Sequence, residues 1–368
     1  MTSPGTSPAT SSLPTGMPVV WSPTTREHDP RHEVWVGVPT PAVEVPSRVD
    51  EILGALGERH PLVPARGHSD EPLARVHAPE LLRFLATAAE QWAAGPYADL
   101  VGQDRMVPYV FPTAALLQGM PPTPATALHG RAGAFCYDTM TLVGPGTWPA
   151  ARAAVDCALT AVDLVTDGEP AAYALCRPPG HHATRDGYGG SCYLNNAAVT
   201  AEALRAAGHP RVAVLDVDAH HGNGTQAVFW ERADVLYGSV HVDPADGWFP
   251  HLFGHASETG GGAGRGATRN LPVPEGSGDE IWLEGVAALA SWAGAREPTA
   301  LVISLGVDAA ADDPESPLQV SRDGYRETGR LLGALGLPTV LVQEGGYHLP
   351  TLGSLVAACL DGHQQAAG

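Results

Sequence analysis

The sequence predicts an α/β fold of three layers, in which helices cover both faces of a central, mostly parallel β-sheet. Three observations favour this fold. Short apolar runs lack the polar alternation of half-exposed strands, which indicates strands buried on both faces. These runs alternate with segments of helical periodicity. Several runs also end in polar side chains, as expected where parallel strands end at one edge of a sheet.

The expected elements follow one another along the chain. Segments near 50–60 and 79–93 place apolar residues three and four positions apart, which predicts two helices. From about residue 150 onward, predicted helices and strands alternate. The strands are 171–176, 211–217, 234–240, 300–306 and 339–345, and the helices are 149–165, 195–207, 279–293 and 321–335.

The domain organisation is predicted to be simple. Residues 1–20 are rich in Ser, Thr and Pro and lack the basic start and apolar core of a secretory signal, so we expect a disordered tail. No linker-like stretch divides the remainder, which predicts one catalytic domain over 21–368. Within it, the Pro- and Gly-rich stretch 95–149 has no clear period. We interpret it as a long loop excursion, and loops of that length usually serve function or contact a partner.

The composition excludes several classes of protein. No run of about 18 apolar residues is present, so no transmembrane helix is predicted. The formal charge of −19 argues against a nucleic-acid partner, whose phosphates require a basic face, and it is compatible with a cationic substrate. The cysteines are too few and too scattered for a disulfide framework or a CxxC metal site, which favours reduced thiols in a cytoplasmic protein. They are Cys136, Cys157, Cys176, Cys192 and Cys359.

Four predicted strands end in side chains that can do chemistry. Strand 171–176 is followed by "RPPGHH", and strand 211–217 is followed by Asp218 and His220. Strand 300–306 leads to Asp308, and strand 339–345 leads to Tyr347. One polar strand end is explained by an ordinary loop, but four such ends at one edge predict a site.

Asp218, His220 and Asp308 are the predicted metal ligands. Asp218 and His220 lie two residues apart on an extended segment, so their side chains project to the same side. Two carboxylates and one imidazole balance a divalent cation and leave positions open for water and substrate, as in catalytic zinc sites. A two-metal site of the arginase type needs another carboxylate just after the histidine. The sequence reads "DAHHG" there, which favours a single ion.

The adjacent histidines His181 and His182 supply groups that titrate in the range needed for proton transfer. Asp216 and Asn223 are the expected partners that fix their tautomers. Tyr347 follows two glycines, so its phenol can approach a substrate carbonyl and donate a hydrogen bond to the developing oxyanion. Taken alone, a tyrosine at a sheet edge is more often a packing residue.

With these residues in place, the chain resembles the histone deacetylase superfamily, and most closely the bacterial acetylpolyamine amidohydrolases. The resemblance runs from about residue 26 to 362. It is densest in "LCRPPGHHATRDGYGGSCYLNNAAVTA", "VAVLDVDAHHGNGTQAVFWERADVLYGSVHVDP", "FGHASETGGGAGRGATRNLPVP", "ISLGVDAAADDP" and "QEGGYH".

The resemblance implies the arginase/deacetylase fold with an eight-stranded sheet. It assigns zinc to the three predicted ligands, general base or acid–base catalysis to His182, and an electrostatic role to His181. It assigns Tyr347 to the oxyanion, and Asp216 and Asn223 to support of the histidines. It also implies a structural potassium ion, with ligands from Asp216, Asp218, His220, Ser239 and Val240.

Relatives of this kind enclose the acyl chain between two aromatic rings. Phe249 matches one ring, whereas "GSC" at Gly190 and Ser191 stands where the second ring is usual. Ser191 is expected to widen the tunnel and leaves room for a bulkier acyl group or amine. Asp138 is a candidate for binding a substrate ammonium or amide at the rim. The 95–149 excursion resembles a loop that forms a homodimer and narrows the entrance.

The sequence therefore predicts a zinc-dependent amidohydrolase that removes an acyl group, expected to be acetyl, from an acetylpolyamine or a related small cationic amine. Two alternatives within enzymes are a protein lysine deacetylase and a deacylase of a biosynthetic intermediate. A binding module without activity is disfavoured, because Tyr347 and both histidines are present.

Overall fold

The computed structural model describes residues 16–96 and 105–367. Its central sheet has eight strands in the order β4-β1-β5-β10-β9-β6-β7-β8, and every neighbouring pair is parallel. The strands of this sheet are β1 (Val19–Trp21), β4 (Leu62–Pro64), β5 (Ala171–Ala174), β6 (Val212–Asp216), β7 (Val235–Val242), β8 (Thr268–Val273), β9 (Ala300–Leu305) and β10 (Thr339–Gln343). The predicted three-layer α/β/α class is confirmed.

The described α-helices are α1 (Ser47–Leu56), α2 (Glu71–Val76), α3 (Pro79–Ala93), α4 (Ala114–Leu117), α5 (Leu128–Ala132), α6 (Thr147–Thr166), α7 (Asn196–Ala206), α8 (Asn223–Phe229), α9 (Asp279–Gly294), α10 (Arg322–Gly333) and α11 (Leu349–Ala367). A short antiparallel hairpin, β2 (His32–Trp35) with β3 (Val38–Pro41), lies outside the main sheet. No helix among the described residues combines the length and the apolar character that crossing a membrane requires.

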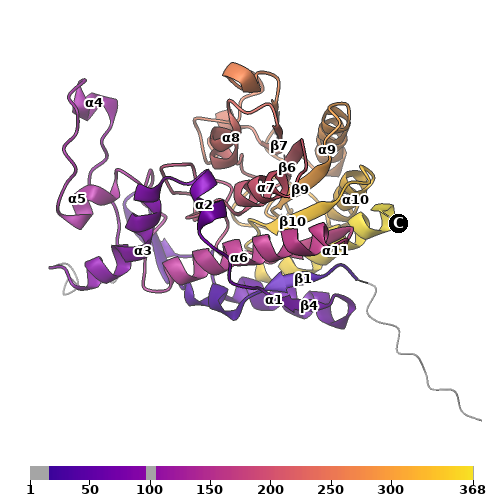
Figure 1. Ribbon diagram of the computed structural model, residues 1–368, viewed down its shortest axis with the longest axis horizontal. Coiled ribbons are helices and arrows are strands. Elements are labelled where there is room, and N and C mark those ends of the chain that lie inside the picture. The colour runs from indigo at the N-terminus through magenta and orange to yellow at the C-terminus, as the bar shows by residue number, and fades with distance from the viewer. Residues whose placement is uncertain (1–15, 97–104, 368) are drawn as a thin grey trace, which may run out of the picture.

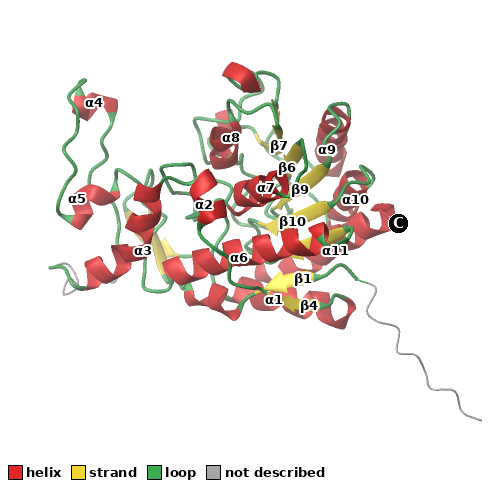
Figure 2. Cartoon of the chain, in the orientation of Figure 1, coloured by secondary structure: helices red, strands yellow, loops and turns green. Residues whose placement is uncertain are grey.

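Helices lie on both sides of the sheet in Figure 2, and an apolar core lies against each of its faces. Helices α2, α3, α6, α7 and α8 contribute to one core, and α1, α9, α10 and α11 contribute to the other. Successive strand residues alternate between them: in β9, Val302 belongs to the first core and Ile303 to the second. Because side chains point alternately to opposite faces, strands buried on both sides are apolar at most positions, which explains the unalternating runs.

The amino-terminal end of the chain needs one correction to the sequence prediction. Val19 and Val20 were expected in a disordered tail over 1–20, but they lie in β1, which pairs with both β4 and β5. A three-residue strand is too short to give a periodic signal. Residues 1–15 of the expected tail lie outside the described residues. At the other end, the long helix α11 packs against α1 and α10.

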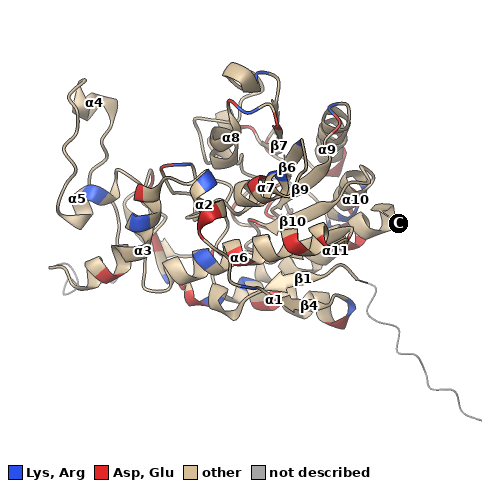
Figure 3. Cartoon of the chain, viewed as in Figure 1, with Lys and Arg blue, Asp and Glu red and all other residues tan. Residues whose placement is uncertain are grey.

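The predicted 95–149 excursion carries two short helices, α4 and α5, and ends where α6 begins at Thr147. Residues 97–104 of this excursion lie outside the described residues. Figure 1 shows α4 and α5 on an arm that extends away from the sheet. In Figure 3 the arm is almost without charge, and residues 106–130 contain no Asp, Glu, Lys or Arg.

Candidate active site

The side chains predicted to do chemistry lie together beyond the carboxyl ends of the neighbouring strands β5, β10, β9 and β6. Parallel strands bring residues that are far apart in sequence to one edge of the sheet, as the sequence analysis expected. A pocket opens there, with about 430 Å³ of empty space that includes the solvent at its mouth. It is lined by Glu33, Val43, Met140, His182, Gly190, Ser191, His220, Phe249, Glu315 and Tyr347.

Asp218, His220 and Asp308 form a buried cluster whose ligand atoms all lie within 4.8 Å of one another. Nδ1 of His220 is 3.2 Å from Asp218 Oδ1 and 3.1 Å from Asp308 Oδ2. Glycines make room for the carboxylates: a Cβ on Gly345 would lie 2.2 Å from Asp308 Oδ2, and one on Gly306 would lie 2.1 Å from Asp218 Oδ2. Two carboxylates and one imidazole in this cradle fit a divalent cation of the zinc type.

The electrostatics of the cluster agree with a site for a cation. Burial, followed by the charge of Asp218, raises the pKa of Asp308 to about 7. Two buried carboxylates repel each other unless a positive charge lies between them. No lysine or arginine is among the residues that line the pocket.

His181 and His182 lie side by side, with ring centroids 4.0 Å apart, but have opposite electrostatic environments. Burial lowers the pKa of His181, but the charges of Asp218 and Asp216 outweigh it and raise the pKa to about 10. For His182, burial and the neighbouring charges of His181 and His220 lower the pKa well below its usual value. Two adjacent histidines whose pKa values are shifted in opposite directions suit different roles in proton transfer.

Hydrogen bonds fix both rings. Nδ1 of His182 lies 2.7 Å from Asn223 Oδ1, an oxygen that can only accept, so this nitrogen donates and Nε2 keeps its lone pair. Nδ1 of His181 lies 3.1 Å from Asp216 Oδ2. Asp216 also accepts from the hydroxyl of Tyr237 at 3.3 Å and from the backbone N–H of Asp218 at 3.2 Å. The structure thus brings each histidine to the partner that the sequence predicted.

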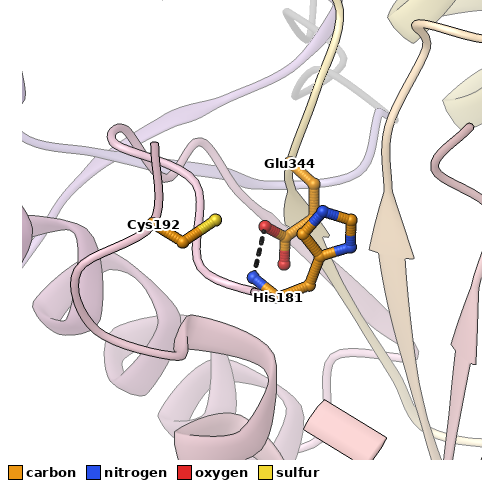
Figure 4. Close-up of side chains that lie close together, drawn as sticks. All are labelled: His181, Cys192 and Glu344. Atoms are coloured by element: carbon orange, nitrogen blue, oxygen red, sulfur yellow. Dashed lines mark hydrogen bonds between the residues drawn. The ribbon is translucent and has the colours of Figure 1, made fainter. Parts of the chain in front are cut away.

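Glu344 holds the turn before the histidine pair, and sequence reasoning missed it. Its Oε2 accepts the backbone N–H groups of Gly180 at 2.6 Å and of His181 at 3.1 Å. Figure 4 shows this carboxylate between His181 and the thiol of Cys192, and the three residues form a second cluster of ligand-type groups. Burial raises the pKa of the Cys192 thiol well above its usual value, which disfavours the thiolate that binds metal. The cluster therefore fits a role in positioning His181 better than a metal site.

Tyr347 is held by a buried arginine. Nε of Arg48 donates to the carbonyl of Gly346 at 2.6 Å, and its Nη2 donates to the carbonyl of Glu344 at 2.6 Å. The guanidinium carbon lies 4.8 Å from the centroid of the Tyr347 ring. Glu44 balances the charge of Arg48, with Oε1 at 2.8 Å from Nη1. Glu44 and Arg48 belong to the amino-terminal segment and are remote in sequence from the loop they support, so no local motif pointed to them.

The residues that the resemblance assigned to potassium lie on adjacent strands. The register of β6 with β7 pairs Asp216 with Ser239, and Val240 follows in β7. Asp218 and His220 continue the chain just beyond β6. All five residues are buried.

Phe249 and the Gly190–Ser191 turn both line the pocket, and Gly190 lies close to the Phe249 ring. The Phe249 ring meets the His182 ring edge-on, with centroids 4.7 Å apart. Gly190 has a φ of +57°. A Cβ on Gly190 would come within 2.5 Å of His182 and 2.8 Å of Phe249, so a side chain does not fit. Ser191 lines the pocket next to Met140 where a ring was expected.

Asp138 does not occupy the rim, and its predicted role in binding an ammonium needs correction. Its carboxylate accepts the backbone N–H groups of Gly190 at 2.6 Å, Met140 at 3.0 Å and Thr141 at 2.9 Å. It is not among the residues that line the pocket. Its oxygens are used to hold the Gly190 turn in place.

Two other carboxylates, Glu33 and Glu315, line the pocket mouth, and sequence reasoning missed both. Burial, followed by the charges of Glu315 and Asp138, raises the pKa of Glu33 to about 7. Burial likewise raises the pKa of Glu315. Neither forms an ion pair with an arginine in the part of the chain that the structure describes. Glu33 lies in the hairpin strand β2, and Glu315 directly follows the "ISLGVDAAADDP" stretch beyond β9, but nothing local to either residue indicated that its side chain would line the pocket.

Comparison with known proteins gives consistent matches over nearly the whole chain. The family model of the histone deacetylase domain matches residues 42–363. An acetylpolyamine amidohydrolase of Mycoplana ramosa is 39% identical over 349 residues, which cover 94% of this chain and 99% of the relative. One of Burkholderia pseudomallei is 44% identical over 312 residues, 84% of this chain and 87% of the relative.

The structural comparison agrees with the sequence comparison. The crystal structure of an acetylpolyamine aminohydrolase from Burkholderia pseudomallei, obtained with an iodide soak, superimposes with a TM-score of 0.90 at 40% sequence identity. The superposition covers 96% of this chain and 100% of the other.

Proposed function

This chain belongs to the histone deacetylase family and is a hydrolytic deacetylase, and we propose that it uses one zinc ion to remove the acetyl group from acetylated polyamines or related small cationic amines. The converging groups of Asp218, His220 and Asp308 are the ligands that we assign to the ion. We assign the potassium ion to Asp216, Asp218, His220, Ser239 and Val240. The family match and the donor set support this proposal.

A divalent ion bound there would polarise the amide carbonyl and lower the pKa of a water molecule. His182 is then the general base: its Nε2 carries the lone pair, and its environment keeps the ring neutral. The same nitrogen, once protonated, can return the proton to the leaving amine. His181 stays cationic beside Asp216 and supplies positive charge near the reacting oxygen.

Tyr347 is the hydrogen-bond donor that we assign to the developing oxyanion. Burial raises the pKa of its phenol well above the usual value, so the hydroxyl keeps its proton at physiological pH. Arg48 holds the loop through the carbonyls of Glu344 and Gly346, which limits the reorganisation needed during reaction.

The observation that favours a cationic amine is the pair of carboxylates at the mouth. Glu33 and Glu315 are partly buried and form no ion pair with an arginine among the described residues, so burial costs each of them solvation. A substrate ammonium between them would supply a compensating charge. A carboxylate–ammonium hydrogen bond of this kind contributes about 1.5–3 kcal/mol.

Replacing Glu315 by glutamine should lower kcat/KM for N-acetylputrescine by about tenfold or more, because a charged hydrogen bond is lost. N-Acetylbutylamine has a similar length without the ammonium, so its kcat/KM should change little. Steady-state kinetics on both amides tests this. Glu275→Gln removes an exposed carboxyl elsewhere and serves as the control. Equal losses on both substrates would contradict ammonium recognition, and turnover of acetyl-lysine peptides alone would favour a protein deacetylase.

We also propose that the arm carrying α4 and α5 forms a homodimer. Tyr109, Leu116 and Met120 on this arm are 81%, 54% and 63% exposed, and no charged residue separates them. An extended, uncharged segment with large exposed apolar side chains is typical of a surface that binds a partner.

The double variant Leu116→Glu with Met120→Glu is therefore expected to halve the mass in solution, since two carboxylates would be buried in the contact. Light scattering coupled to size exclusion measures the mass. Leu62→Glu changes a similarly exposed leucine outside the arm and should leave the mass unchanged. A double variant with the mass of the unaltered protein would argue against the arm as the interface.

A further inference from the structure

One buried carboxylate, that of Asp313, connects the loop of Tyr347 with the segment of Glu315. Its Oδ2 accepts the backbone N–H of Tyr347 at 2.6 Å and of His348 at 3.1 Å. Its Oδ1 accepts the backbone N–H of Glu315 at 3.1 Å. The two segments follow different strands, β10 and β9, so this side chain ties together groups from separate parts of the sheet edge.

The Asp313 carboxylate is buried and hydrogen-bonded, so its side chain is held in one position. Its exposed fraction is only 7%, and the three N–H donors compensate its carboxylate oxygens. Asp312, its neighbour, differs: it lies 3.1 Å from Nδ1 of His348 as an exposed ion pair. Replacing a buried carboxylate that accepts several backbone N–H groups lowers the free energy of unfolding, because each lost acceptor leaves a buried donor unpaired.

We propose that Asp313 is a positioning residue that sets two functional groups at once, the phenol of Tyr347 and the carboxylate of Glu315. This inference rests on the proposed function, in which the phenol binds the oxyanion and Glu315 binds the substrate ammonium. Asp313 therefore holds constant the distance between the site of the reacting carbonyl and the site of the ammonium. This fixed distance makes the enzyme selective for the length of the diamine substrate.

A double-mutant cycle tests the connection to Tyr347. In the unaltered background, Asp313→Ala should lower kcat about 10²-fold, the loss that a displacement of about 1 Å can cause. It should also raise KM for N-acetylputrescine but not for N-acetylbutylamine. In a Tyr347→Phe background, Asp313→Ala should cause no further loss of kcat, while the selective rise in KM remains. Additive losses of kcat, or equal changes of KM for both amides, would overturn the proposal.

Three further measurements keep the outcome decisive. Asp313→Asn preserves the shape and one acceptor, so its effects should be intermediate, and Asp312→Asn is the matched control with no expected effect. Crystal structures of the Asp313 variants should show both Tyr347 and Glu315 displaced. If both side chains stay in place, the inference fails whatever the turnover. By contrast, an unaltered protein that hydrolyses neither amide would refute the proposed function. The crystal structures of the Asp313 variants would then still test whether Asp313 positions Tyr347 and Glu315.

Discussion

Replacing Asp308 by alanine should abolish both metal binding and turnover, with kcat/KM reduced more than about 100-fold, the upper range for loss of a residue that only supports a ligand. Removing one of three ligands leaves Asp218 and His220 too weak to hold the ion at neutral pH. Metal content by elemental analysis and kcat/KM on N-acetylputrescine are the two measurements.

Chelation provides the control for this variant. The unaltered protein should lose activity with a chelator and recover it when zinc is added back, whereas Asp308→Ala should not recover. Asp308 Oδ1 also accepts the backbone N–H of Ala219 at 2.8 Å, so the melting temperature must be measured alongside. A stably folded Asp308→Ala protein that retains one ion per chain and full activity would remove Asp308 from the proposed ligands.

Replacing Tyr347 by phenylalanine should reduce kcat by about 10²–10³, the range for loss of one oxyanion donor, while KM changes little. The phenol is expected to interact with charge that develops only in the transition state, and an interaction of this kind appears in kcat. Steady-state kinetics separates the two constants. Metal content should be unaffected.

If Tyr347→Phe instead raised KM and left kcat unchanged, the tyrosine would contribute to ground-state binding and not to stabilisation of the oxyanion. A loss in Tyr347→Phe together with loss of metal would point to a disturbed site and not to a missing hydrogen bond.

The two histidines of the site have identical side chains, but their surroundings give them different pKa values and suit them to different roles. His181 and His182 are neighbours in sequence, yet His181 lies against Asp216 and Asp218, whereas His182 lies against Asn223 and the ring of His181. Their pKa values move in opposite directions as a result. The identity of the residues would allow either to be the base, and only their surroundings favour His182.

The sheet was predictable because its strands are buried on both faces. Apolar runs such as those of β6 and β9 stand out, and the polar residues that follow them mark one edge. The short strands β1 and β4, and β8 with its polar positions, carry no such signal. Their place in the sheet depends on pairing with neighbours, which is a property of the assembled fold.

The mouth of the pocket was predicted less well than its base. Asp138 was expected to bind substrate but holds the Gly190 turn through three backbone N–H groups. Glu33 and Glu315 are the carboxylates that line the mouth. Loops reach the mouth from several directions, so the direction of a loop side chain depends on which backbone donors the neighbouring segments present.

The sequence by itself determined the parallel sheet, the edge at which the chemistry lies and the residue types available to a divalent ion, because the alternation of side chains and the motifs after each strand are local properties. Tertiary structure alone decided which carboxylates line the pocket, which partner each histidine meets, and how Arg48 and Asp313 hold Tyr347. These features depend on burial and on contacts between segments that lie as much as about 300 residues apart, and such contacts come into being only when the sheet has formed.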